Sequence, residues 1–282
     1  MKNINNWQTL NRISDDRLFE ARAQLHQAVQ LLTAVGISFI PPKADDSHTS
    51  FKWSQKSLSF LSQGFGGELA FHLSLNPLDL TLQAFHSDEL LAEIKLNGVT
   101  LKQAATDLEF FWEDHGLPED VFTMKRHFEL PDYPDRWETV FDISDTDAFQ
   151  TLASSYGNAA SEFEARIKND SRASGLMIWP HHFDLASLID TGAGKSIGLG
   201  ISPGDGSYTA PYYYVSVWPY PSAEQIKAQP LSQGVWHTKG WTGMVLTLDQ
   251  ITTCSEGSGQ KSVVDTFLNE ALSHAERMSG AE

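Results

Sequence analysis

Three ionisable side chains fall within four residues of one another in the run WPHHFDLA: His181, His182 and Asp184. On an extended strand alternate side chains share a face, so His182 and Asp184 would point the same way. An imidazole and a carboxylate so placed can bind zinc, iron or manganese if a third ligand approaches. His237, in the aromatic context GVWHTKGW, is the candidate third ligand. The sequence therefore offers His182, Asp184 and His237 as a hypothetical site for a divalent metal.

The same residues also have a purely structural interpretation. Asp184 could accept hydrogen bonds from backbone groups or from a tyrosine, with the histidines partly buried and neutral, because buried polar groups normally find partners. Pro180 has no N–H for a sheet ladder, so a strand Trp179–Asp184 is predicted to bulge or to lie at an edge. Irregular strands turn side chains toward clefts. We therefore predict a pocket beside this strand, roofed by the strand Tyr212–Trp218.

Aromatic residues gather in the same part of the chain, in the segments APYYYVSVWPYP and GVWHTKGW. Rings on neighbouring strands can form a flat wall on which a sugar or another planar group stacks. They serve equally well as sheet core, where cross-strand aromatic pairs stabilise the pairing. Both interpretations stay open. The predicted ligand-binding residues are Trp179, Asp184, Tyr212, Tyr214, Trp218 and Trp236.

Familiar catalytic signatures are missing from the sequence. It has no P-loop and no H-E-x-x-H zinc motif. The run GAGKSIGLG at 192–200 imitates a phosphate loop, but it opens a strand-like segment, whereas a phosphate loop needs a helix N-terminus. The single cysteine, Cys254, excludes an intrachain disulfide and a multi-cysteine zinc site. The sequence therefore does not decide whether the protein is an enzyme.

The net charge of the chain indicates which classes of partner it does not bind. The chain carries 36 acidic against 20 basic residues, a formal net charge of -16. A field of that sign repels nucleic-acid phosphates and anionic lipid surfaces. No window of about 18 consecutive apolar residues occurs, and the first residues lack the apolar core of a signal peptide. We predict an acidic, soluble, cytoplasmic protein that binds neither nucleic acid nor membranes; its oligomeric state is not indicated.

Two periodicities describe the elements that must hold these residues. Apolar residues recur at spacings of three and four in segments typical of amphipathic helices: 15–35, 100–116, 147–167 and 260–278. Alternation of period two between those segments predicts half-buried antiparallel strands: 58–60, 68–75, 78–84 and 92–96, then 175–189, 196–202, 212–218, 234–238 and 243–249. Val121–Phe128 is predicted as a further strand, and Thr100 with Gln103 as a capping box.

The order helix, about four strands, helix therefore occurs twice. Strands in blocks between helices favour an α+β fold, with antiparallel sheet and amphipathic helices on one face. We predict a single compact unit over residues 1–282, built from two similar halves, 1–143 and 144–282. The segment LPDYPDRWE, rich in proline and aspartate, is the candidate boundary.

The second half resembles an uncharacterised bacterial family, catalogued as a domain of unknown function (number 5996). FEARI, WPHHFDLA and APYYYVSVWPYP carry the resemblance, at Trp179, Phe183–Ala186, Pro211–Tyr214, Tyr220 and Pro221. The family has small residues in place of His181 and His182, so the resemblance implies no histidine role. Since the family has no known activity, it implies a kinship of fold and no chemistry.

Two functions are consistent with these patterns. The first is a small-molecule-binding protein or enzyme, with a pocket between the sheet and the helices of the second half, lined by the aromatic residues and the His/Asp cluster. The second is a non-catalytic interaction or scaffold protein in which those aromatic residues are core. Convergence of His182, Asp184 and a third histidine on a cavity favours the first; their dispersal through a packed core favours the second.

Overall fold

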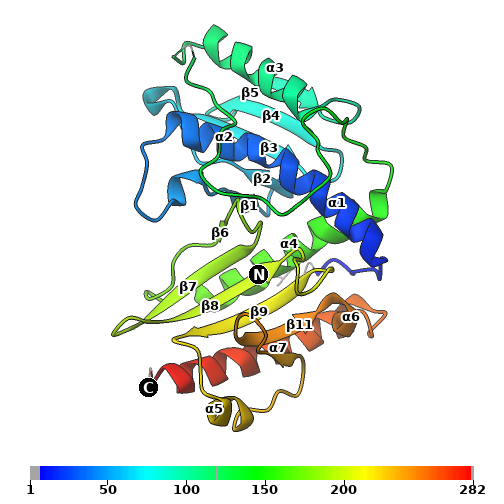
Figure 1. Ribbon diagram of the computed structural model, residues 1–282, viewed down its shortest axis with the longest axis vertical. Coiled ribbons are helices and arrows are strands. Elements are labelled where there is room, and N and C mark those ends of the chain that lie inside the picture. Colours follow the sequence, from blue (N-terminus) through cyan, green and yellow to red (C-terminus); the bar gives the residue numbers. More distant parts are fainter. Residues whose placement is uncertain (1–6, 119, 281–282) are drawn as a thin grey trace, which may run out of the picture. The chain divides into compact units, whose positions relative to one another are not determined.

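The computed structural model describes residues 7–118 and 120–280 (Figure 1). The chain separates into two compact units. Unit 1 takes the described residues up to Asp15, then Ser154–Leu176 and those from Asp184 onward, and unit 2 takes Asp16–Ala153 and Met177–Phe183. Their bounds differ from the predicted halves 1–143 and 144–282: the described residues before Asp16 lie in unit 1, whereas residues 144–153 and 177–183 lie in unit 2.

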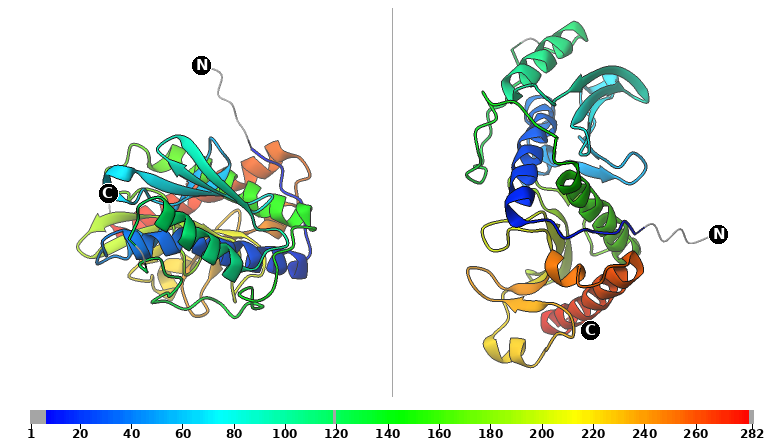
Figure 2. Two further views of the ribbon diagram at one scale, coloured as in Figure 1. Left: turned by 90° about the horizontal axis from the view of Figure 1, so that it is seen from above. Right: turned by 90° about the vertical axis from the view of Figure 1, so that its right-hand side faces the viewer.

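Unit 2 contains a five-stranded antiparallel sheet with the strand order β1-β2-β3-β4-β5. Its strands are β1 (Lys52–Ser54), β2 (Ser59–Leu61), β3 (Phe71–Asn76), β4 (Thr81–His86) and β5 (Glu89–Lys95), and the short β6 (Met177–Ile178) also lies in this unit. Its helices are α1 (Asp15–Ala28), α2 (Gln30–Phe39), α3 (Leu101–Asp114) and the start of α4 (Thr146–Ile167), with 3-10 turns η1 (Ser47–Thr49) and η2 (Gly67–Leu69). Figures 1 and 2 show α1, α2 and α3 on one face of the sheet.

The helix predicted over residues 15–35 is divided in the structure. A turn at Val29 separates α1 from α2, and α2 continues past Gly36 to Phe39. Gly36 does not end the helix. It instead allows a close approach of the backbone at His48, since a Cβ on Gly36 would lie 2.5 Å from the His48 carbonyl oxygen. The capping box predicted at the start of α3 is present, with the Thr100 hydroxyl accepting from the Gln103 backbone N–H.

Two predicted strands are wrong. Residues 121–128 are coil, and their backbone donors bond to side chains: Thr123 N–H donates to Ser38 Oγ (2.9 Å) and Lys125 N–H to Thr123 Oγ1 (3.1 Å). The segment from Trp179 to Asp184 contains a turn, closed by the Phe183 N–H donating to the Trp179 carbonyl at 2.7 Å. Phe183 adopts a left-handed φ of 59°, which is incompatible with a continuous strand.

Unit 1 holds five strands of the six-stranded second sheet, in the order β10-β11-β9-β8-β7. These strands are β7 (Leu185–Gly192), β8 (Lys195–Ser202), β9 (Tyr212–Trp218), β10 (Val235–His237) and β11 (Gly243–Thr247). Its helices are the rest of α4, α5 (Ala223–Lys227), α6 (Leu248–Ile251) and α7 (Gly257–Ser279). Figure 2 shows α7 and this part of α4 on the same face of the sheet.

Alternation along β9 divides its side chains between two faces. Tyr213, Val215 and Val217 face the helices, and the ring of Phe163 in α4 meets the Tyr213 ring edge-on at 5.8 Å. Tyr212 and Tyr214 take the opposite face. All strand pairs given a register are antiparallel, and helices accompany both sheets, so the predicted α+β class is confirmed. Within the described residues, none of the helices has the length and apolar character needed to cross a membrane.

The Tyr213 hydroxyl is buried without a hydrogen-bond partner among the described residues. Replacing it in Tyr213→Phe removes an unsatisfied polar group and keeps the ring, so we expect the free energy of unfolding to stay the same or rise by up to about 1 kcal/mol. The matched change Tyr212→Phe should lower it, because the Tyr212 hydroxyl donates to Asp205 Oδ2 at 2.6 Å. Urea denaturation of both variants measures the difference, and a loss in Tyr213→Phe as large as in Tyr212→Phe would contradict it.

Candidate functional site

A long segment without regular structure crosses the helical side of unit 2. We call residues 122–137 the strap; they connect the region after α3 to the region before α4. The first part of the strap is fixed by Phe122, whose ring stacks against Phe39 of α2 with centroids 6.3 Å apart. Further along, His127 Nε2 lies 3.2 Å from an Asp46 carboxylate oxygen. The strap is therefore attached to the elements beneath it, although it belongs to no sheet.

The second part of the strap is held by one glutamine of α1. Gln27 Nε2 donates to the Pro134 carbonyl (2.9 Å), and its Oε1 accepts from the Arg136 N–H (3.1 Å). The buried Arg136 guanidinium donates to Glu20, and the Arg136 carbonyl accepts from the Leu101 N–H at 3.0 Å. A side-chain amide thus replaces the backbone partner that a strand would have provided.

Tyr133 attaches the middle of the strap to a buried histidine. His26 is 1% exposed, with Nε2 2.7 Å from the Pro180 carbonyl and Nδ1 3.1 Å from the Tyr133 hydroxyl. A carbonyl oxygen only accepts, so Nε2 carries the proton and Nδ1 accepts from Tyr133. Burial lowers the pKa of His26 to about 3; the Pro180 hydrogen bond opposes this shift, and the positive charges of Arg22 and Arg126 add to it.

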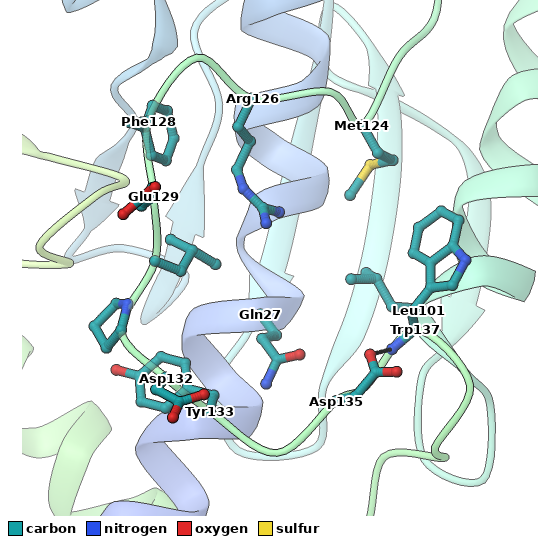
Figure 3. Close-up of a pocket in the computed structure, with 12 residues that line it drawn as sticks. Gln27, Leu101, Met124, Arg126, Phe128, Glu129, Asp132, Tyr133, Asp135 and Trp137 are labelled. Atoms are coloured by element: carbon teal, nitrogen blue, oxygen red, sulfur yellow. Dashed lines mark hydrogen bonds between the residues drawn. The ribbon is translucent and has the colours of Figure 1, made fainter.

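Beneath the strap lies a pocket of about 720 Å³, in the size range of small-molecule sites (Figure 3). Its apolar lining residues are Leu101, Met124, Phe128, Leu130, Pro131 and Trp137. Its polar lining residues are Gln27, Arg126, Glu129, Asp132, Tyr133 and Asp135. Most of these residues belong to the strap, so the strap's path over α1 creates the pocket.

Arg126 is the distinctive group of this pocket. Figure 3 shows its side chain extending from the strap into the space that the strap encloses. The side chain is half-buried, its Nε is shielded from solvent without an acceptor, and no hydrogen bond or ion pair joins it to any described residue. Burial lowers the pKa of Arg126, and no neighbouring carboxylate raises it. The pocket thus contains a cation whose charge the protein does not neutralise.

Several of the predicted site residues gather on the other face of β9, in unit 1. Asp184 Oδ2 accepts from the Tyr214 hydroxyl at 2.5 Å, as the structural interpretation of Asp184 predicts. The Tyr214 ring lies over Gly200, where an added Cβ would be 2.4 Å from it. Burial and the Asp184 charge raise the pKa of Tyr214 well above 10, so the phenol remains a donor.

His237 belongs to this aromatic face, with both ring nitrogens engaged. Nδ1 lies 3.1 Å from the Tyr208 hydroxyl, and Nε2 lies 2.7 Å from the Lys239 carbonyl. The imidazole also stacks on Trp241 at 4.5 Å. With Nε2 donating to a carbonyl, Nδ1 is the acceptor for Tyr208. In this arrangement His237 acts as a structural link between aromatic side chains.

The three predicted tryptophans do not join one wall. Trp218 is 56% exposed, and its ring meets Tyr220. Trp236 pairs with Met244 on the helix-facing side of the sheet, and its Nε1 donates to the Gln229 carbonyl at 2.9 Å. Trp179 lies in unit 2, where its ring is 6.3 Å from that of His181. Alternation explains Trp236, because it and His237 must point to opposite faces.

The hypothetical metal site at His182, Asp184 and His237 stays a prediction. Over residues 7–118 and 120–280, no three or more His, Cys, Asp or Glu side chains gather so that they could hold a metal ion. The premise that His182 and Asp184 share a strand face is wrong, because a turn replaces that strand. None of the predicted site residues lines the pocket beneath the strap, which lies in unit 2, whereas the predicted pocket was assigned to the second half.

Sequence reasoning missed the strap residues because the first of them were predicted as a strand and the rest as a boundary. LPDYPDRWE contains Tyr133, Arg136 and Trp137, and MKRHFE before it contains Arg126. The available signal was a density of aromatic and arginine residues unusual for a connecting segment.

No family model matches the chain, and no curated protein and no solved structure matches it either. The resemblance of the second half to the family of unknown function stays a prediction.

Proposed function

We propose that the protein binds a small organic anion in the pocket beneath the strap, with Arg126 as the group that receives the charge. One observation carries this proposal: a half-buried guanidinium that points into a pocket and has no acceptor among the described residues. Removing a cation from water is unfavourable unless a partner replaces the lost hydration. A bound anion is such a partner.

The chemistry of the pocket indicates what the anion looks like. A guanidinium offers planar, forked donors that match a carboxylate or a phosphate oxygen pair. Half of the lining residues are apolar, and these include Met124, Phe128 and Trp137. Apolar side chains in such a pocket contact the apolar body of a ligand, and polar groups set its orientation. We therefore expect an organic acid with an apolar or aromatic body.

The test is binding of defined anions to the full chain. We expect 3-phenylpropionate, 4-methylvalerate or phenyl phosphate to bind, detected by saturation-transfer NMR and quantified by calorimetry. Arg126→Gln should weaken binding at least tenfold, since the charged donor is lost. Lys125→Gln is the matched control: it removes the same charge from an exposed neighbouring residue and should change binding less than twofold.

Two results would contradict the proposal. One is that none of the three anions binds the wild-type protein; the other is that Arg126→Gln and Lys125→Gln weaken binding equally. Misfolding does not confuse the outcome, because removing an unpaired half-buried cation should leave the thermal midpoint unchanged or higher. The midpoint of each variant is measured alongside its binding.

A further inference from the structure

The strap carries charges of both signs around the pocket. Three of its carboxylates line the pocket, on Glu129, Asp132 and Asp135, and all three residues are exposed. None forms an ion pair with Arg126 within 4.0 Å. In Figure 3 the Arg126 side chain points into the enclosed space, whereas Glu129, Asp132 and Asp135 follow the course of the strap. The pocket therefore presents a cation toward its interior and anions along its border.

The protein leaves these carboxylate charges largely unneutralised. Glu129 and Asp132 have no hydrogen bond or ion pair with any residue in the described ranges. Asp135 uses Oδ1 to accept from the Trp137 N–H at 2.8 Å, which leaves Oδ2. The other cations of the strap are engaged elsewhere or exposed: Arg136 donates to Glu20, and Lys125 is exposed.

We propose that the pocket takes a zwitterion: a molecule of the amino-acid class, with its carboxylate on Arg126, its ammonium toward the strap carboxylates and its apolar side chain against the wall. The inference rests on the proposed function, because it assigns the anionic end to Arg126. An anion alone would satisfy Arg126 but would be repelled by Glu129, Asp132 and Asp135. An ammonium on the same molecule converts that repulsion into attraction.

Exposure sets the size of the expected effect. Because ion pairs at the surface are individually weak, we expect the ammonium to raise the affinity by about threefold to tenfold, which corresponds to about 0.7–1.4 kcal/mol. Salt screens exposed charges, with a screening length of about 10 Å at 0.1 M. The gain should therefore shrink as salt is added, whereas binding of the carboxylate to half-buried Arg126 should be less sensitive.

Three probes of the same shape separate the charges. Calorimetry of the full chain at low salt compares L-phenylalanine, 3-phenylpropionate, which lacks the ammonium, and phenethylamine, which lacks the carboxylate. We expect phenylalanine to bind about threefold to tenfold more tightly than 3-phenylpropionate, and phenethylamine to bind most weakly. The triple change Glu129→Gln, Asp132→Asn and Asp135→Asn should remove the advantage of phenylalanine.

A second triple variant controls for net charge. Asp88→Asn, Glu89→Gln and Glu93→Gln neutralise three exposed carboxylates of the β4–β5 hairpin in the same unit, and the advantage of phenylalanine should persist in it. If 3-phenylpropionate binds the wild type as tightly as phenylalanine, the zwitterion inference is wrong and the proposed function stands. If phenylalanine keeps its advantage in the strap triple variant, the inference is also wrong. If none of the three probes binds, both proposals fail.

Discussion

Acidification from pH 6.5 toward pH 3 is expected to lower the free energy of unfolding by up to about 1.4 kcal/mol per pH unit through His26 alone. The folded-state pKa of His26 is about 3, against 6.5 for a free histidine. The unfolded chain therefore binds a proton between these values that the folded chain does not, and stability falls as the pH falls. Above pH 6.5 both states are neutral at this position and the effect is absent. Over the whole interval it amounts to about 5 kcal/mol.

The geometry explains why the folded protein resists this proton. A proton on Nδ1 would remove the acceptor of the Tyr133 hydroxyl, and the resulting cation would face the positive charges of Arg22 and Arg126. The ring is also stacked on Phe183 at 4.9 Å, in surroundings that do not solvate charge. Protonation would therefore force the Tyr133 hydroxyl to turn from donor to acceptor and would place a charge in surroundings that do not solvate it.

Urea denaturation at several pH values between 7 and 4 measures this effect. In His26→Gln the slope of unfolding free energy against pH should become shallower, whereas in His86→Gln, which replaces an exposed histidine, it should stay as in the wild type. Should His26→Gln be too unstable to measure, the imidazole signals of wild-type His26 give the answer by NMR. A titration of the His26 chemical shifts with a midpoint near pH 6.5 would contradict the prediction.

Breaking the ion network between α4 and α7 is expected to lower the free energy of unfolding by about 2–4 kcal/mol. Arg166, whose side chain is 15% exposed, lies 2.7 Å from a Glu162 oxygen and 2.9 Å from an Asp265 oxygen. Lys261 bridges the same two carboxylates at 2.9 and 2.6 Å. Burial opposes the charge of Lys261, but its hydrogen bonds to Asp265 and Glu162 raise its pKa. The loss is large because Glu162 is only 10% exposed and, without Arg166, would keep Lys261 as its single cationic partner.

Arg166→Met is the change that tests this network by thermal and urea denaturation. Lys102→Met is the control, since its ion pair with Glu138 is exposed on both sides, 54% and 64%, and surface pairs contribute little. Glu162→Gln in the Arg166→Met background should cause a smaller further loss than Glu162→Gln alone, because the two residues share one interaction. Equal losses in Arg166→Met and Lys102→Met would show that the network contributes no more than a surface pair.

Local patterns were enough to predict the class of the fold. The helix α3 shows why: its capping box at Thr100 and its apolar stripe, which includes Leu108, lie within one short segment. In β9, likewise, buried and more exposed side chains alternate within a single short segment. Pro180 indicated an irregular strand, but the turn after Trp179 was not predicted, because nothing in the sequence signals that Phe183 takes a left-handed conformation.

The candidate site could not be predicted because it depends on contacts distant in sequence. Arg126 becomes significant only when the strap crosses α1, and that path depends on bonds from Gln27 to Pro134 and Arg136, more than a hundred residues away. Conversely, Asp184 resembled a ligand because the position of Tyr214 beside it was unknown. The type of a polar residue shows which hydrogen bonds it can form, but the fold determines which partner it contacts.

The segmented path of the chain through unit 1 has a consequence for synthesis on the ribosome. The Leu10 N–H donates to Gln260 Oε1 and the Leu10 carbonyl accepts from Gln260 Nε2, both at 2.8 Å and 250 residues apart. At about 5–20 residues per second, roughly 12–50 s pass between translation of these two partners. Leu10, buried in the finished protein, spends that time without its Gln260 partner, while nearly all of unit 2 has already emerged. The segment at Leu10 is thus translated before unit 2 but is fixed only after it, and in that interval it is open to chaperones and proteases.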